Sequence, residues 1–118
     1  MIDYVDPVPP VVRFLSTYLP DIQIHGNQFS NPTYPALLVK NTGGIDYTRI
    51  QLRCRAQKDY EAMNGLIHAM NTLTRYAANI SGLRVMWCGK ETNPIPSEDA
   101  DSNMQEAWCY MRLEHLEA

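Results

Sequence analysis

Hydrophobic and polar residues alternate most regularly between Tyr47 and Gln57. Every second position there is apolar or small, and a period of two is typical of a strand with one buried and one open face. The buried set is predicted to be Ile50, Leu52, Cys54 and Ala56, and the open set Arg49, Gln51, Arg53 and Arg55. We therefore predict a strand that lays one face on a core and presents a basic face to solvent or to a partner.

A second alternating segment runs from about Glu106 to His115. Its apolar set is Ala107, Cys109, Met111 and Leu113, and its other set is Trp108, Tyr110, Arg112 and Glu114. Apolar runs bounded by turn residues predict shorter strands at 21–25, 34–40 and 83–88, the first of them at a sheet edge. The paired glycines of the turn Asn41–Gly44 allow the chain to reverse into the arginine-bearing strand.

Two segments show helical spacing of their apolar residues instead. The first, from about Val8 to Tyr18, is entered through Pro9 and Pro10, which suit a first helical turn. The second, from Lys58 to about Ala78, repeats apolar residues at i, i+3, i+4 and i+7 along one face. Between Asn93 and Ser102 the chain is acidic, contains prolines and lacks periodicity, so we predict a projecting loop.

The order of these elements is helix, two or three strands, long helix and two strands. This order favours an α+β fold, with a mainly antiparallel sheet of four to five strands packed by a short N-terminal helix and one long central helix. A chain of 118 residues is sufficient for one domain, and no repeat or composition change divides it. We therefore expect a single domain over residues 1–118.

The charge balance argues against nucleic-acid binding. Ten Lys and Arg residues and thirteen Asp and Glu residues give a formal net charge of −3, whereas nucleic-acid-binding domains show an excess of basic residues. No apolar run approaches the roughly 20 residues that cross a bilayer. The first residues also lack the basic and apolar regions of a secretory signal. We expect synthesis in the cytoplasm and no membrane contact.

Residues that could perform chemistry are scattered through the sequence. Cys54, Cys88 and Cys109 form no CxxC pair, so buried reduced thiols are favoured over a disulfide or a metal site. The three histidines fall in different predicted elements and match no spacing of zinc ligands. We therefore predict no catalytic, cofactor-binding or metal site, and a protein that is not an enzyme.

The arginines of the strand 47–57 are the main polar feature. A row of like charges on one strand face must be solvated or paired. Three interpretations stay open: a solvated face, a contact with acidic residues of a neighbouring subunit, and a contact with an anion. The net negative charge disfavours the anion contact. Trp108 and Tyr110 either form an interface or lie under a second layer. The residues predicted to interact are Arg49, Arg53, Arg55, Glu98, Asp99, Asp101, Trp108 and Tyr110.

The segment Pro35–Gly44, with the sequence PALLVKNTGG, precedes the arginine-bearing strand and the helix that starts at Lys58. In this order the chain resembles the phage tail-terminator and minor-capsid proteins, over roughly residues 8–90. The resemblance implies a structural virion protein at the tail or head–tail junction of a long-tailed phage or prophage. Such a protein forms a homo-oligomer, commonly a hexameric ring, which caps the tail tube and docks to the head-side connector. DNA passes through the ring without specific binding, and no cofactor or catalytic residue is implied.

Two alternatives to a tail terminator stay open. A head-completion or adaptor protein is also a small α+β ring subunit, and a small non-catalytic binding module needs no ring. In a ring, identical subunits make head-to-tail contacts. We expect such contacts to place the arginine face of one subunit against the acidic loop Asn93–Ser102 of the next, or to pair open strand edges.

Overall fold

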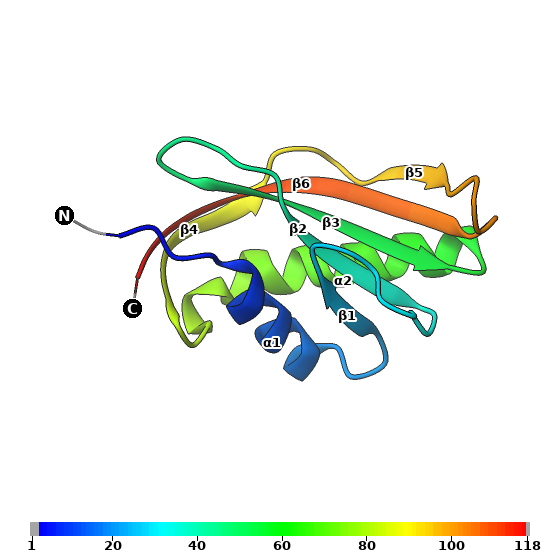
Figure 1. Cartoon of the computed structure of the whole chain (residues 1–118), viewed down its shortest axis with the longest axis horizontal. Helices are drawn as coiled ribbons and strands as arrows, with labels where there is room; N and C mark the ends of the chain where they lie inside the picture. Colours follow the sequence, from blue (N-terminus) through cyan, green and yellow to red (C-terminus); the bar gives the residue numbers. More distant parts are fainter. Residues whose placement is uncertain (1–2, 118) are drawn as a thin grey trace.

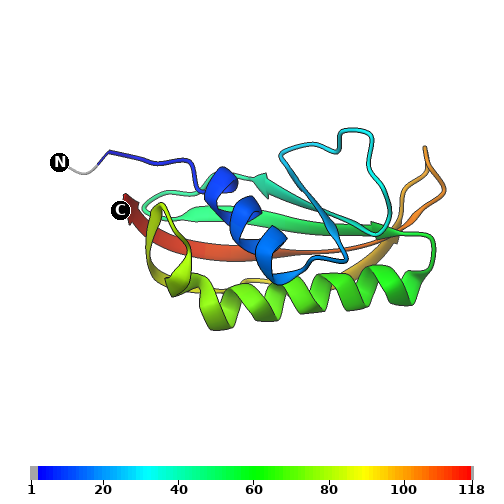
Figure 2. The same cartoon turned by 90° about the horizontal axis from the view of Figure 1, so that it is seen from below.

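Both helices lie on the same face of a six-stranded sheet (Figure 1, Figure 2). The computed structural model describes residues 3–117. Its elements are α1 (Val8–Tyr18), β1 (Gln23–Gly26), β2 (Ala36–Asn41), β3 (Thr48–Ala56), α2 (Asp59–Tyr76), a short 3-10 helix η1 (Ala77–Asn79), β4 (Leu83–Lys90), β5 (Ile95–Glu98) and β6 (Gln105–Glu117). The predicted bounds of the first helix agree with the structure, and both alternating segments form the long strands.

β6 joins the two halves of the sheet. On one side it pairs antiparallel with β3 along the whole of that strand, and on the other it pairs with β4 and then with β5. β2 pairs antiparallel with β3 and parallel with the edge strand β1, which gives the order β1-β2-β3-β6-β4. Among the strand pairs formed by residues 3–117, only β1–β2 is parallel, so the α+β class and the mainly antiparallel sheet are confirmed.

The prediction of a projecting loop from Asn93 to Ser102 is wrong over part of that segment. Its middle forms β5, which pairs with β6 from Ile95↔Trp108 to Glu98↔Gln105, and only residues 99–104 form a turn. Pro96 obscured the strand in the sequence, but β5 lies at the sheet edge, where a proline is tolerated. The sheet therefore has six strands instead of the four to five expected.

The core lies between the sheet and the two helices. Along β3, buried and half-buried residues alternate without a break, which confirms the period of two. The fully buried side chains include Leu52, Cys54, Cys109, Met111 and Leu113 of the sheet, Val11 and Leu15 of α1, and Leu66, Ala69 and Leu73 of α2. Burial of these side chains from water is the main stabilising contribution to the fold.

α2 approaches β3 most closely at Gly65. A Cβ atom at this position would lie 2.7 Å from Cys54 Sγ and 3.4 Å from Ile22 Cδ1. Carbon and sulfur atoms do not approach this closely without displacing one another, and both neighbours belong to the packed interior. The glycine is therefore needed for close contact between the helix and the sheet.

The three thiols are expected to be unreactive in the folded protein. Cys54 and Cys109 are buried and Cys88 is half-buried, and burial raises the pKa of Cys54 and Cys88 to about 12 and that of Cys109 to about 11. Little thiolate therefore exists at pH 8, and the thiolate is the nucleophile. We expect iodoacetamide to label the native protein at least ~100-fold more slowly than the guanidinium-unfolded protein, as followed by mass spectrometry. Rapid labelling of any cysteine in the native state would contradict this.

Candidate functional site

Within residues 3–117, no helix covers the second face of the sheet (Figure 2). Neighbouring positions of β3 and β6 fill the middle of this open face, and most of their side chains are half-buried. The pairs that face each other are Arg55↔Glu106, Arg53↔Trp108, Gln51↔Tyr110 and Arg49↔Arg112. We call this set the arginine–aromatic face. It includes the three arginines and both aromatic residues that the sequence singled out, and no helix of the described part of the chain covers Trp108 or Tyr110.

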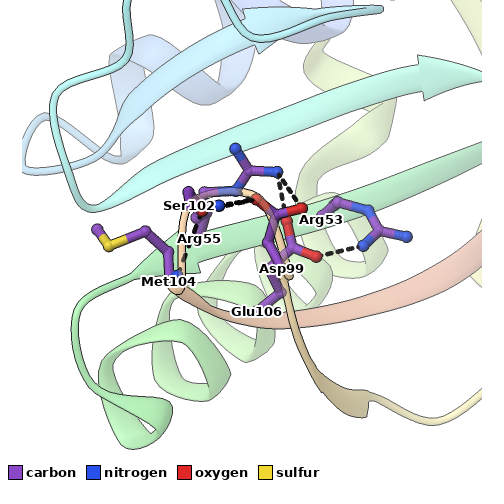
Figure 3. A network of polar contacts seen from close by, with 6 residues as sticks. All are labelled: Arg53, Arg55, Asp99, Ser102, Met104 and Glu106. Atoms are coloured by element: carbon purple, nitrogen blue, oxygen red, sulfur yellow. Dashed lines mark hydrogen bonds and ion pairs between the residues drawn. The ribbon is translucent and has the colours of Figure 1, made fainter.

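Glu106 connects two arginines of this face (Figure 3). Its Oε1 accepts a hydrogen bond from Arg53 Nη1 at 2.5 Å, and its Oε2 accepts one from Arg55 Nε at 2.8 Å. Arg55 Nη2 lies 2.7 Å from the same Oε2. The Glu106 side chain is only 3% exposed, so its charge depends on these two partners instead of water.

Asp99 extends this cluster from the β5–β6 turn (Figure 3). Its Oδ1 lies 3.7 Å from Arg55 Nη2, and its Oδ2 accepts hydrogen bonds from the hydroxyl and the backbone N–H of Ser102. The bonds from Ser102, helped by the charges of the two arginines, keep the pKa of the Asp99 carboxyl below its ordinary value. The turn is thereby fixed against the arginine–aromatic face.

Aromatic rings lie beneath the guanidinium groups of this face. The distances from Cζ to the ring centre are 3.9 Å for Arg49 on Tyr110, 5.6 Å for Arg53 on Trp108, 4.5 Å for Arg55 on Phe29 and 4.0 Å for Arg112 on Tyr47. Trp108 and Tyr110 also meet edge to face, with ring centres 5.5 Å apart. Stacking on a ring holds each planar guanidinium in a defined orientation.

Two further carboxylates pair with the remaining arginines. Glu91 Oε1 lies 3.2 Å from Arg49 Nε, although the contact lacks hydrogen-bond geometry, and Glu114 Oε1 accepts a hydrogen bond from Arg112 Nη2 at 3.2 Å. Both pairs are partly solvated, so each contributes on the order of 1 kcal/mol or less. All four arginines thus have a carboxylate partner in their own chain.

These pairs change the expected role of the acidic segment. Asp99 meets Arg55 within one chain, so the charge match expected between two subunits is made, in part, inside a single subunit. Glu98 Oε2 accepts a hydrogen bond from Gln105 at 3.4 Å, and Asp101 is exposed on the turn. The structure does not bring Glu98 or Asp101 to the arginines.

The sequence did not indicate Glu106, the central acid of this face. The predicted strand begins at about Glu106, and its alternation places Glu106 on the same face as Trp108, but the partners of Glu106 follow only from the register with β3. Phe29 comes from a loop that no periodicity marked, whereas Tyr47 opens the alternating segment on the same side as Arg49 but was not singled out. Residues outside the strands supply two of the four rings that lie beneath the guanidinium groups of this face.

A separate polar cluster holds the N-terminal segment against the end of the sheet. Asn41 Nδ2 donates to Tyr4 Oη at 2.9 Å, Tyr4 Oη lies 3.1 Å from Thr48 Oγ1, and that hydroxyl lies 2.8 Å from His115 Nε2. The cluster borders a hollow of about 390 Å³. Burial lowers the pKa of His115, which favours a neutral imidazole at pH 7. These contacts anchor the segment before α1 against the end of the sheet.

Among the described residues, 3–117, no group of three or more His, Cys, Asp or Glu side chains is placed to hold a metal ion. No helix in this part of the chain combines the length and apolarity needed to cross a bilayer. The chain matches no protein-family model, and no curated protein matches it significantly. Function is therefore inferred from the surface that the fold leaves open.

Proposed function

We propose that this chain is a structural virion protein of a long-tailed phage or prophage. It is a tail-terminator or head–tail joining subunit that forms a ring, hexameric as in the family it resembles, and it has no enzymatic role. The ring caps the tail tube, docks to the head-side connector and lets DNA pass without specific binding. The observation that supports this proposal is the arginine–aromatic face, which we assign as the surface for a protein partner.

The composition of this face suits contact with a protein. Tyr, Trp and Arg are enriched in the cores of protein interfaces and supply most binding hot spots. Here the guanidinium groups are already held over rings and paired with carboxylates. A partner would therefore immobilise few additional side-chain torsions, which lowers the entropic cost of association.

A nucleic-acid partner fits the same face poorly. Affinity for a phosphate backbone comes mainly from basic groups that displace counterions, and each arginine here is paired with a carboxylate. The bases of a single-stranded nucleic acid bind a protein by stacking on its aromatic rings. The guanidinium of Arg49 already lies over Tyr110, so that ring face is not free for a base. Both observations favour a protein partner.

The sheet edges are poorly suited to pairing between neighbours. β1 has only four residues, and on the opposite edge β4 has an irregularity at Met86, between Val85 and Trp87, and is followed by Pro94 and Pro96. Short strands, bulges and prolines are features that prevent edge-to-edge pairing. We therefore place the ring contacts on faces and loops, in preference to the edge pairing expected from the sequence.

Deleting the gene from the phage or prophage genome that contains it tests the proposed function. We expect electron microscopy of the lysate to show tails of uncontrolled length if the protein terminates the tail, or separate heads and tails if it completes the head. A plasmid copy should restore infectious particles. A copy with both Trp108→Ala and Tyr110→Ala should fold, as checked by circular dichroism, and fail to restore them. Normal particles from the deletion strain would exclude both virion roles and leave the binding module.

A further inference from the structure

An isolated apolar side chain projects from the turn between β2 and β3. Ile45 is 84% exposed, more than any other large hydrophobic residue described. The turn that bears it is ordered, because Thr42 N donates to Arg49 O at 2.7 Å and Gly43 N donates to Asn41 Oδ1 at 2.9 Å. The backbone therefore holds Ile45 in water at a defined place.

An apolar groove lies on the helix side of the molecule, beside α1. Its volume is about 350 Å³, and its lining is Pro10, Arg13, Phe14, Thr17, Tyr18, Asn79 and Ser81. The Tyr18 ring stacks on Tyr76 with ring centres 5.3 Å apart and meets Phe14 at a tilt of 42° with centres 4.7 Å apart, so one wall of the groove is aromatic. A single aliphatic side chain would occupy part of such a groove, and the apolar atoms that it buries there would lose their contact with water.

The charges beside the two features are complementary. Asp46 follows Ile45 on the exposed turn, and the exposed Arg13 lines the groove. Between residues 3 and 117, neither Asp46 nor Arg13 makes an ion pair. Ile45 and the groove cannot meet within one chain, because the β2–β3 turn lies at the upper left of Figure 1 and α1 lies below the sheet.

From this match we infer that copies of the chain associate head to tail, with Ile45 of one copy in the α1 groove of the next and Asp46 of the first copy paired with Arg13 of the second. Each copy offers one projection and one groove at different places, so the contact is heterologous and repeats around a ring when the rotation closes. The inference deepens the proposed function and rests on it for the closed ring, while the pairwise contact is testable alone.

Sedimentation velocity of the purified full-length protein over a range of concentrations tests this contact. Wild type should form a discrete oligomer larger than a dimer. Ile45→Asp and Arg13→Asp should each weaken association by about tenfold or more, because the first buries a charge in the groove and the second opposes Asp46 with a like charge. Met86→Ser, which removes another exposed apolar side chain, is the control and should associate as wild type does.

The change Asp46→Asn identifies the charge pair, since Asn tolerates the positive φ of 64° at this position. It should weaken association in wild type and strengthen it in the Arg13→Asp background, where it removes the repulsion. Three results would overturn the inference. Asp46→Asn could change association in the same direction in both backgrounds, Ile45→Asp could associate as strongly as wild type, or wild type could be monomeric. If the gene-deletion phenotype appears while these variants associate normally, the proposed function stands and this contact is wrong.

Discussion

Glu106→Gln should lower the free energy of unfolding by about 3 kcal/mol, because removing one partner of a buried ion pair leaves the other charges uncompensated. The carboxylate is almost fully buried and accepts hydrogen bonds from both Arg53 and Arg55. An amide of the same shape offers one acceptor oxygen, and its NH₂ group faces a second donor. The two guanidinium groups are then held close together without a neutralising charge. Urea denaturation at pH 7 measures the loss.

A matched variant separates this effect from the loss of any surface carboxylate. Glu114→Gln removes the partner of Arg112, and the side chains of that pair are 40% and 39% exposed. Its expected cost is below about 0.5 kcal/mol, as for other exposed pairs. If both variants lose the same small amount of stability, Glu106 is not the electrostatic centre of the arginine–aromatic face.

Gly65→Ala should destabilise the protein by about 2 kcal/mol, the typical cost of forcing extra atoms into a packed core. Helix propensity alone predicts the opposite sign, since alanine exceeds glycine by about 1 kcal/mol in a helix interior. The added Cβ would meet Cys54 Sγ at 2.7 Å, and Cys54 is fully buried near the C-terminal end of β3. The sign of the change in the urea midpoint therefore decides between local propensity and packing.

A second substitution should relieve the clash specifically. Cys54→Ala removes the sulfur atom, so Gly65→Ala should cost at least about 1 kcal/mol less in that background than in wild type. Asn64→Ala, at the adjacent exposed position of α2, is the control and should stabilise slightly through propensity alone. Gly65→Ala behaving like this control would show that α2 can move away from the sheet without loss.

The parts of the fold that the sequence predicted are those with strong local periodicity. β3 alternates over its whole length and β6 from Ala107 to Leu113, because one face of each packs on the helices and the other stays open. α1 was delimited by prolines near both ends of its apolar stripe. β5 was missed because a four-residue edge strand containing Pro96 has a weak pattern and depends on β6 for its hydrogen bonds.

The candidate site was predictable only as a list of side chains on one face. The alternation of polar and apolar residues placed Arg49, Arg53 and Arg55 on one face of the predicted strand, and the same rule placed Trp108 and Tyr110 on one face of theirs. Their partners follow from the β3–β6 register, which is a non-local property that no single segment contains. The loop conformation that brings Phe29 under the guanidinium group of Arg55 lies even further from any local pattern.

The central place of β6 also orders the events of folding. During synthesis, β6 emerges after every other strand of this sheet, so β3 lacks its longest partner until then. Pairing strands so distant in sequence requires closing a long loop, and topologies dominated by such contacts fold slowly. Until β6 docks, Arg53 and Arg55 have no Glu106 to hold them, and Trp108 has not yet joined the sheet. The face proposed for assembly therefore forms last, which delays contacts through it until the subunit is complete.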